Sequence, residues 1–245
     1  MLNFLTSPLF YIFMTIGVYF LFAFLRKKTK LDIFNPLLWS IIFIASYILF
    51  ITFMIYRNVE NENLSVEVNK YEEATFILDL LLSPVTVALA IPLYINRHLI
   101  KENWLPIIVA SVVGVGSSFL TVYLLGLALG IDQSITFAML PRGVTTAIAK
   151  DVASILGVSE QVSITISMVV LTGVIGATLG PLLIKLFHDK DDIVVGLSLG
   201  SSSHAIGTSK AFEYSEKAGS IATISIITNG LLTVLLSLII TLASK

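Results

Sequence analysis

Residues 200–213, GSSSHAIGTSKAFE, form the most polar continuous segment of the chain, and long apolar runs lie on both sides of them. The chain is 56% hydrophobic and only 13% charged, and its mean hydropathy is +0.93. A soluble domain carries about a quarter charged residues. This composition indicates a chain embedded in a membrane, so the polar segment needs an explanation other than an ordinary surface loop.

Apolar runs long enough to cross a bilayer are spread along the whole sequence. A crossing helix needs roughly 20 apolar residues, and the runs that approach or exceed this length are residues 4–25, 36–55, 107–129, 162–187 and 218–242. The runs are continuous, whereas the strands of a membrane barrel alternate between apolar and polar residues. We therefore expect a single polytopic transmembrane domain over residues 1–245, an all-α integral membrane protein with seven or eight hydrophobic segments.

Charge and motif content exclude several classes of protein. The net charge of −1 gives no basis for a nucleic-acid partner, and the absence of cysteine excludes disulfides and thiolate chemistry. Zinc-protease, P-loop and dinucleotide motifs are missing, so we expect no metal and no cofactor. Residues 196–200, GLSLG, match the nucleophile elbow G-x-S-x-G, but that motif requires a strand–turn–helix context. The same residues read as GxxxG, as do 126–130 and 176–180, and close helix packing explains all three. We therefore expect a protein that is not an enzyme.

The distribution of cations predicts the topology. Residues 26–30, RKKTK, mark a cytoplasmic loop after the first span and place the N-terminus outside. The polar, acidic stretch after Arg57 is expected to be an outside loop. A third segment, residues 71–94, then returns inward to the cations of residues 97–101, and the run 107–129 goes back out.

Two hydrophobic segments have polar interruptions, residues 134–156 and 194–218. If residues 134–156 dip into the membrane and return, the loop KLFHDKDD joins the other cations inside, which the positive-inside rule favours. Irregular backbone at membrane depth requires surrounding protein or a water-filled cavity. The pattern V-T-x-A-[LI]-A occurs at 85–90 and again at 144–149, which is consistent with a possible inverted repeat and with Thr86 lining a site. Chance remains the alternative.

A polar stripe defines the second interrupted segment. Gly200, His204 and Thr208 are spaced i, i+4 and i+8, so they share one helix face, with Ser201 and Gly207 at its border. Ionisable residues inside a membrane are costly and usually mark pathways. We interpret the stripe as part of a solute site, the alternative being a histidine bonded to a neighbouring helix.

A helix start after Pro141 defines the first interrupted segment. A helix that begins near Val144 points free N–H groups and its positive dipole end at the break, which suits an anion. Arg142 is adjacent, and Thr145 and Thr146 offer hydroxyls. The alternative is an ordinary loop-to-helix junction.

Two further polar residues lie within apolar runs. Asp79 needs a cationic partner, a proton or water; Arg142 or Lys150 could pair with it, and a role in proton coupling, shared with His204, stands beside a structural ion pair. Asn229 could face the same cavity, although an interhelical hydrogen bond is its expected role.

Three segments resemble the LrgB/CidB family of bacterial membrane proteins, which includes the plastid glycolate/glycerate transporter. Residues 81–94, LLSPVTVALAIPLY, resemble the family's run ending in VALAxPLY. Residues 141–151, PRGVTTAIAKD, resemble P-x-S-V-T-T-P-I-A-x-E, and residues 196–213 resemble G-x-x-x-G-x-x-x-H-x-x-G-T-x-x-A-x-E. The chain departs from this pattern at Gly143, Ala147 and Asp151, where the family has serine, proline and glutamate.

The resemblance implies a multi-pass protein of the bacterial cell membrane and two possible functions. One is an antiholin- or holin-like regulator of murein hydrolase activity and autolysis, acting with a small partner of the LrgA/CidA type. The other is a carrier of small carboxylates such as pyruvate or glycolate. The residues favour the carrier, because an anion binds at helix N-termini and hydroxyls replace its lost hydration. We also expect a homo-oligomer.

Overall fold

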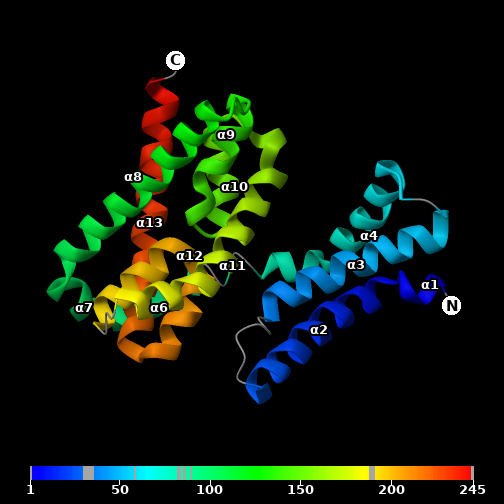
Figure 1. Cartoon of the computed structure of the whole chain (residues 1–245), viewed down its shortest axis with the longest axis horizontal. Coiled ribbons are helices and arrows are strands. Elements are labelled where there is room, and N and C mark those ends of the chain that lie inside the picture. Colours follow the sequence, from blue (N-terminus) through cyan, green and yellow to red (C-terminus); the bar gives the residue numbers. More distant parts are fainter. Residues whose placement is uncertain are drawn as a thin grey trace. The chain divides into compact units, whose positions relative to one another are not determined.

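The structure is a computed structural model that describes residues 2–29, 36–57, 59–81, 84, 87–88, 90–187 and 191–243. Within these residues every element is a helix and no strand is present, as the all-α prediction requires (Figure 1). The chain forms two compact units, Met1–Pro84 and Val85–Lys245, which are described separately. The elements are α1 Leu2–Leu5, α2 Pro8–Thr29, α3 Pro36–Tyr56, α4 Asn61–Leu80, α6 Ala90–Ile95, α7 Arg97–Glu102, α8 Trp104–Ala128, α9 Gln133–Met139, η2 Leu140–Gly143, α10 Thr146–Ile155, η3 Ser159–Gln161, α11 Val162–Phe187, α12 Asp192–Tyr214 and α13 Glu216–Ala243.

Among the described residues, five helices are long and apolar enough to cross a membrane: Pro8–Thr29, Pro36–Tyr56, Trp104–Ala128, Ser159–Phe187 and Glu216–Ala243. Each of these helices overlaps one of the five apolar runs of the sequence over most of its length. Large apolar side chains such as Phe20 on α2 and Leu124 on α8 are exposed on their surfaces. These faces have the chemistry of a lipid-facing surface.

The first unit packs the polar helix α4 against α2 and α3. Glu67 of α4 is completely buried, where Lys70 donates to it at 2.7 Å and the hydroxyls of Tyr11 and Tyr56 donate at 3.4 Å. The stretch after Arg57 was expected to be a loop and the next segment to begin at residue 71. Both expectations are wrong, because α4 runs continuously from Asn61. Donors to its one buried carboxylate allow this polar stretch to pack as a helix.

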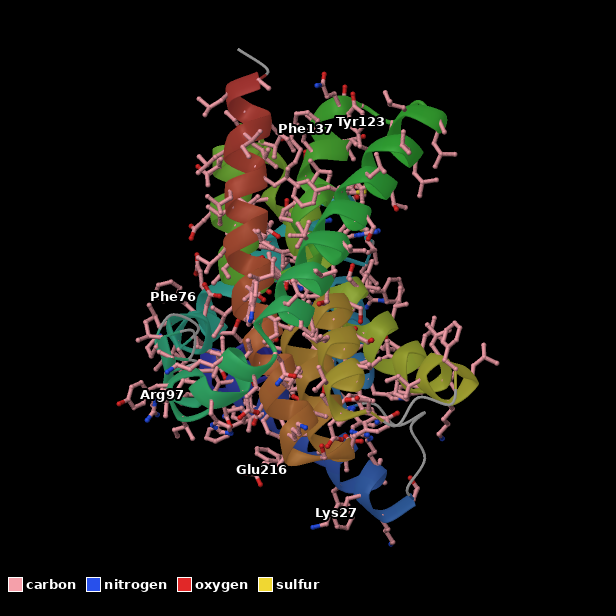
Figure 2. All side chains as sticks on the ribbon, turned by 90° about the vertical axis from the view of Figure 1, so that its left-hand side faces the viewer. Lys27, Phe76, Arg97, Tyr123, Phe137 and Glu216 are labelled. Carbon is pink, nitrogen blue, oxygen red and sulfur yellow. The ribbon has the colours of Figure 1, made fainter. Side chains whose placement is uncertain are left out.

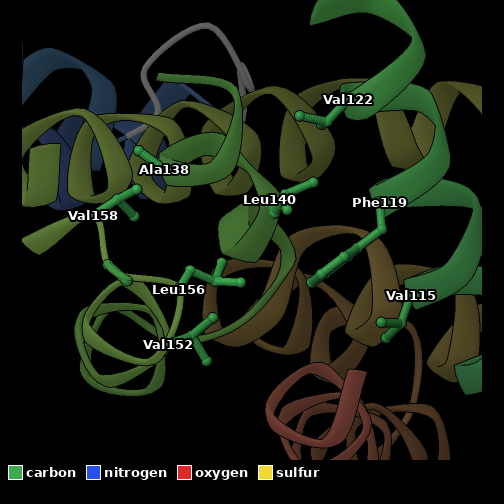
Figure 3. Packing of buried hydrophobic residues seen from close by; sticks show 9 residues of the cluster. Val115, Phe119, Val122, Ala138, Leu140, Val152, Leu156 and Val158 are labelled. Atoms are coloured by element: carbon green, nitrogen blue, oxygen red, sulfur yellow. The ribbon is translucent and has the colours of Figure 1, made fainter. Parts of the chain in front are cut away.

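The segment after α8 is a helical hairpin, hereafter the first hairpin, made of α9, η2 and α10. The chain leaves helical geometry at Val144 (φ −111°, ψ 179°) and Thr145 (φ −67°, ψ 153°). η3, which follows α10, packs beside α9, so the segment returns to the end where it began. Figure 3 shows side chains of both legs, Leu140 before the turn and Val152 after it, directed into one buried cluster with Phe119 of α8. The expected re-entrant course is confirmed.

α12 is also folded back on itself and forms the second hairpin. Its backbone breaks at Ser203 (φ −139°, ψ 17°) and His204 (φ 41°, ψ −132°). Beyond the break, Gly207 packs directly on the carbonyl oxygen of Leu199. In a continuous helix these residues would lie about 12 Å apart. α13 then begins beside the start of α12, since a Cβ at Gly196 would lie 2.5 Å from the carbonyl oxygen of Ala218.

The two hairpins enter the second unit from opposite ends. α8 ends where the first hairpin begins, α11 runs to the other end, and α13 returns from there (Figure 1). Figure 2 accordingly places Arg97 and Glu216 at one end of the unit and Tyr123 and Phe137 at the other. The ten residues of α10 and the leg from Asp192 to Ser202 are each about 15 Å long. That is half of the roughly 30 Å hydrocarbon core, so each leg is long enough to reach the middle of a bilayer and turn there.

Small residues allow the second hairpin to pack closely. A Cβ at Gly200 would lie 2.6 Å from the carbonyl oxygen of Ala222, and one at Gly180 would lie 2.6 Å from Leu199. These contacts bear out the packing interpretation of two GxxxG motifs. It does not hold for Gly130, which has open space around it and φ of +65°. Gly130 instead ends α8 in the left-handed conformation that glycine adopts without steric cost.

Candidate solute-binding site

The tips of the two hairpins meet beside a cavity of about 560 Å³ in the second unit. A Cβ at Gly143 in the first tip would lie 3.9 Å from the carbonyl oxygen of Ser201 in the second. α8 and α11 complete the walls. The lining residues are Gly114, Ser117, Ser118, Thr121, Arg142, Gly143, Met168, Leu171, Thr172, Ile175, Gly176, Ser198, Ser201 and Ser202. The cavity therefore combines hydroxyl groups with one cation.

Arg142 supplies that cation. It is half-buried in η2, and its Nε donates to the Oγ of Ser118 on α8 over 3.4 Å. Among the described residues no carboxylate forms an ion pair with it. A guanidinium has five N–H donors and no acceptor. Most of the donor capacity of Arg142 is thus available to a bound group.

The tip of the second hairpin supplies hydroxyls. Ser201 shares a 2.8 Å hydrogen bond with Ser225 of α13, which fixes this side of the tip. Ser202 is exposed to the cavity, and its Oγ lies 2.9 Å from the Oγ of Ser203. The break in α12 therefore directs successive serines toward different partners.

A small pocket of about 20 Å³ opens beside the main cavity and shares Gly114, Ser118, Gly143 and Ser201 with it. This volume is close to that of one water molecule, since about 10–15 Å³ of such space holds one. Asn229 of α13 lines it with only 2% of its surface exposed, and its Oδ1 has no hydrogen-bond partner among the described residues. A buried acceptor without a partner is costly, so this pocket suits a polar guest.

The predicted stripe does not stay on one face. Ser201 lines the cavity, but His204 and Gly207 are not among the lining residues, because the chain reverses at His204. The Nε2 of His204 lies 2.9 Å from the carbonyl oxygen of Val169 on α11. Thr208 is buried and donates to the carbonyl of His204 at 3.1 Å. The i, i+4, i+8 spacing presumed a continuous helix, which the break removes.

The two threonines of the first hairpin also lie off the cavity lining. Thr145 is the N-cap of α10 and accepts a hydrogen bond from the backbone N–H of Ile148 at 3.5 Å. Thr146 is the first residue of that helix. Their place at the start of α10 matches the predicted helix start.

Thr86 and Asp79 are two further residues that were expected at the site. Thr86 lies outside the described residues, as do Val85 and Leu89 of the same repeat. Asp79 lies in the first unit, one residue before the end of α4. It was expected part-way along a helix beginning at residue 71, whereas α4 begins ten residues earlier.

Sequence reasoning missed most of the hydroxyls that line the cavity, which are Ser117, Ser118, Thr121, Thr172, Ser198 and Ser202. A signal for those of α8 was present. Ser117 and Thr121 are spaced i, i+4, and Gly114 stands three residues before Ser117, so small and polar residues follow one face of an otherwise apolar helix.

The described residues give no support for other chemistry. No group of three His, Cys, Asp or Glu side chains that could hold a metal is found among them. Ser198, the serine of the G-x-S-x-G match, lies inside a helix rather than at the strand–turn–helix junction that the motif requires.

Comparison with known proteins gives a consistent result. The chain matches the model of the LrgB-like family over residues 15–242. It is 34% identical to the antiholin-like protein LrgB of Bacillus subtilis over 94% of this chain and 93% of that protein. It is 31% identical to the holin-like protein CidB of Staphylococcus aureus (strain N315), over 92% of each chain.

A third relative, the uncharacterized protein YxaC of Bacillus subtilis, is 38% identical over 145 residues, which span 59% of this chain and 62% of that protein. No solved structure matches the chain. Because the family model covers nearly the whole sequence and both full-length matches carry the family's names, this chain is a member of the LrgB-like family.

Proposed function

We propose that the protein is a membrane carrier for small carboxylates of the pyruvate or glycolate type. The observation that carries this proposal is Arg142, a half-buried cation at the mid-depth cavity that forms no ion pair with a described residue. A charge at this depth is costly without a counter-charge. A carboxylate supplies it, and guanidinium and carboxylate pair through two parallel hydrogen bonds.

The surroundings of Arg142 suit the same ligand. The positive end of α10 lies three residues further along the chain, at Thr145 and Thr146, and favours an anion. Serine hydroxyls from α8 and from the second tip replace hydration. The amide of Asn229 can contact a second polar group of the solute. Cavity size also agrees, since 560 Å³ is at the lower part of the range for small-molecule sites.

Membership of the LrgB-like family supports the proposed location, topology and partners. We propose a multi-pass protein of the bacterial cell membrane, with its N-terminus outside, no enzymatic activity and an effect on autolysis through metabolite flux. The end of the second unit that carries Arg97 and Lys101 would face the cytoplasm. A small LrgA/CidA-type partner and self-association are proposed with it. The second candidate is a regulator of murein hydrolases without its own solute site, which the names antiholin-like and holin-like of two relatives favour.

Uptake of labelled pyruvate, lactate and glycolate into proteoliposomes tests the carrier. Arg142→Gln should lower uptake about 10–150-fold, because hydrogen bonds between charged groups contribute about 1.5–3 kcal/mol. Arg142→Lys should retain part of the activity. Arg97→Gln, at an exposed arginine of α7, is the matched control. The regulator is favoured instead if no carboxylate moves with the partner present while an entrapped dye leaks.

A further inference from the structure

His204 and Arg57 are the two residues other than glycine with positive φ in the described part of the chain, and of the two only His204 lies inside a helix. Its φ of 41° and ψ of −132° lie in a region that glycine occupies readily and other residues rarely adopt. Positive φ is uncommon for residues other than glycine, and histidine is among the few enriched there. A conformation of this kind persists only where neighbouring contacts hold it.

The imidazole makes one such contact, with α11. Its Nε2 lies 2.9 Å from the carbonyl oxygen of Val169, and the side chain is 5% exposed. A carbonyl oxygen can only accept, so the ring nitrogen that faces Val169 must carry a hydrogen and donate it. This contact therefore ties the turn of the second hairpin to a spanning helix.

α11 has a slot for this turn. A Cβ at Gly173 would lie 2.7 Å from the Nε2 and Cε1 atoms of His204, and one at Gly176 would collide with the side chain of Ser203. Any larger residue at Gly173 would displace the ring. The two glycines and the histidine thus form one packing unit, in which the reversal of α12 is seated against α11.

The same turn sets the position of the serines at the cavity. Ser201 and Ser202 immediately precede the break and line the cavity, whereas His204 does not. A Cβ at Gly114 of α8 would lie 3.6 Å from the Cβ of Ser201, so α8 and the tip are in direct contact.

We infer that His204 is a positioning residue. It closes the turn of the second hairpin, anchors it on Val169 and so holds the serines of the tip at the cavity, without touching the solute or carrying a coupled proton. The inference concerns the tip itself and does not require that the cavity binds a carboxylate.

Disulfide formation tests the position of the tip directly, because the chain has no cysteine. The pair Gly114→Cys and Ser201→Cys has a Cβ separation of 3.6 Å, within the range that a disulfide needs. We expect it to form rapidly in purified protein in liposomes. The pair Gly126→Cys and Thr136→Cys joins α8 to the first hairpin and is the control; its Cβ separation of 3.1 Å is just below that range, so the two helices must move apart slightly for this disulfide to form.

Three substitutions at His204 separate its two roles. His204→Ala fits neither the backbone conformation nor the hydrogen bond. It should slow the 114–201 disulfide about tenfold, the effect expected from losing one buried hydrogen bond, with the 126–136 control unchanged. His204→Gln keeps a side-chain N–H donor and should restore most of the rate. His204→Gly keeps only the backbone freedom and should fall between them.

Gly173→Ala repeats the test with the imidazole intact, in case His204→Ala does not fold. It should slow the 114–201 disulfide to a similar extent. An unchanged rate in both His204→Ala and Gly173→Ala would overturn the inference. A second result would also overturn it: uptake by the unsubstituted protein that depends on pH, and a His204→Gln protein that forms the disulfide normally but has lost that dependence, because His204 would then be a proton carrier. If no carboxylate is transported at all, the disulfide rates still decide the matter.

Discussion

Adding one methyl group at Gly207 tests whether α12 is a hairpin. In the folded-back arrangement, the Cβ of Gly207→Ala would overlap the carbonyl oxygen of Leu199 and crowd the side chain of Ser203. In a continuous helix the same methyl group would meet neither. The substitution therefore distinguishes two backbone courses through a single atom.

The expected magnitude follows from what the methyl group meets. Overpacking a filled site costs about 1–3 kcal/mol, and we expect the upper end because a backbone carbonyl cannot move by changing rotamer. Alanine regains about 1 kcal/mol of helix propensity over glycine. The net loss is then about 2 kcal/mol, which lowers the Tm of a chain of this size by about 4–8 °C.

Gly116→Ala on α8 is the matched control, because no atom lies within 4 Å of the position that its new methyl group would take. This substitution gains only the higher helix propensity of alanine, with no added clash, and should raise Tm by up to about 4 °C. Thermal unfolding of both variants, purified in the same detergent, gives the comparison. Equal Tm values for Gly207→Ala and Gly116→Ala would refute the folded-back course of α12.

Three further outcomes are expected. Thr165→Val removes a buried 2.8 Å hydrogen bond from α11 to α9 and should cost about 1–3 kcal/mol in thermal unfolding, since a buried carbonyl loses its donor; Thr165→Ser should recover most of it. Single cysteines in place of Gln133 and Glu160 should react with an impermeant thiol reagent from the same side of the membrane, and labelling from opposite sides would contradict the first hairpin. Hydrogen bonds from the side chain and backbone of Ser134 hold the pKa of Asp132 below its usual value. The resulting stabilisation is present above the unfolded pKa of about 3.9 and is lost as pH falls through the folded pKa. Asp132→Ala should therefore lower Tm at pH 7, and the difference in Tm between the two proteins should disappear in acid.

The spanning helices could be predicted from the sequence because lipid imposes a simple demand. A crossing helix needs a long apolar run, and residues 162–187 coincide with α11. The break in the first hairpin could also be predicted, since Pro141 and Gly143 interrupt a helix. α4 was misread because its polar residues indicated a loop. The hydroxyls that donate to its buried Glu67 come from two other helices, Tyr11 of α2 and Tyr56 at the end of α3.

The second break could not be read in the same way. No proline or glycine stands at Ser203 or His204, and the reversal depends on the slot of Gly173 in another helix. Local sequence therefore favoured a continuous stripe through His204, which tertiary packing overrides. The hydroxyls of α8 were missed for a related reason, because a serine within an apolar run looks like a small packing residue until the cavity beside it is known.

The polar character of residues 200–213 follows from where the fold places their turn. Each hairpin leg is about half a membrane thick, so its reversal exposes unpaired backbone groups at a depth where lipid offers no hydrogen bonds. Such a turn is stable only if protein or water supplies partners. The two tips meet each other. Three of their side chains bond to neighbouring helices: His204 to the carbonyl oxygen of Val169, Ser201 to Ser225, and Arg142 to Ser118. Arg142 still has N–H donors available at the cavity. Its charge requires a counter-charge inside a membrane, and a small carboxylate can supply one.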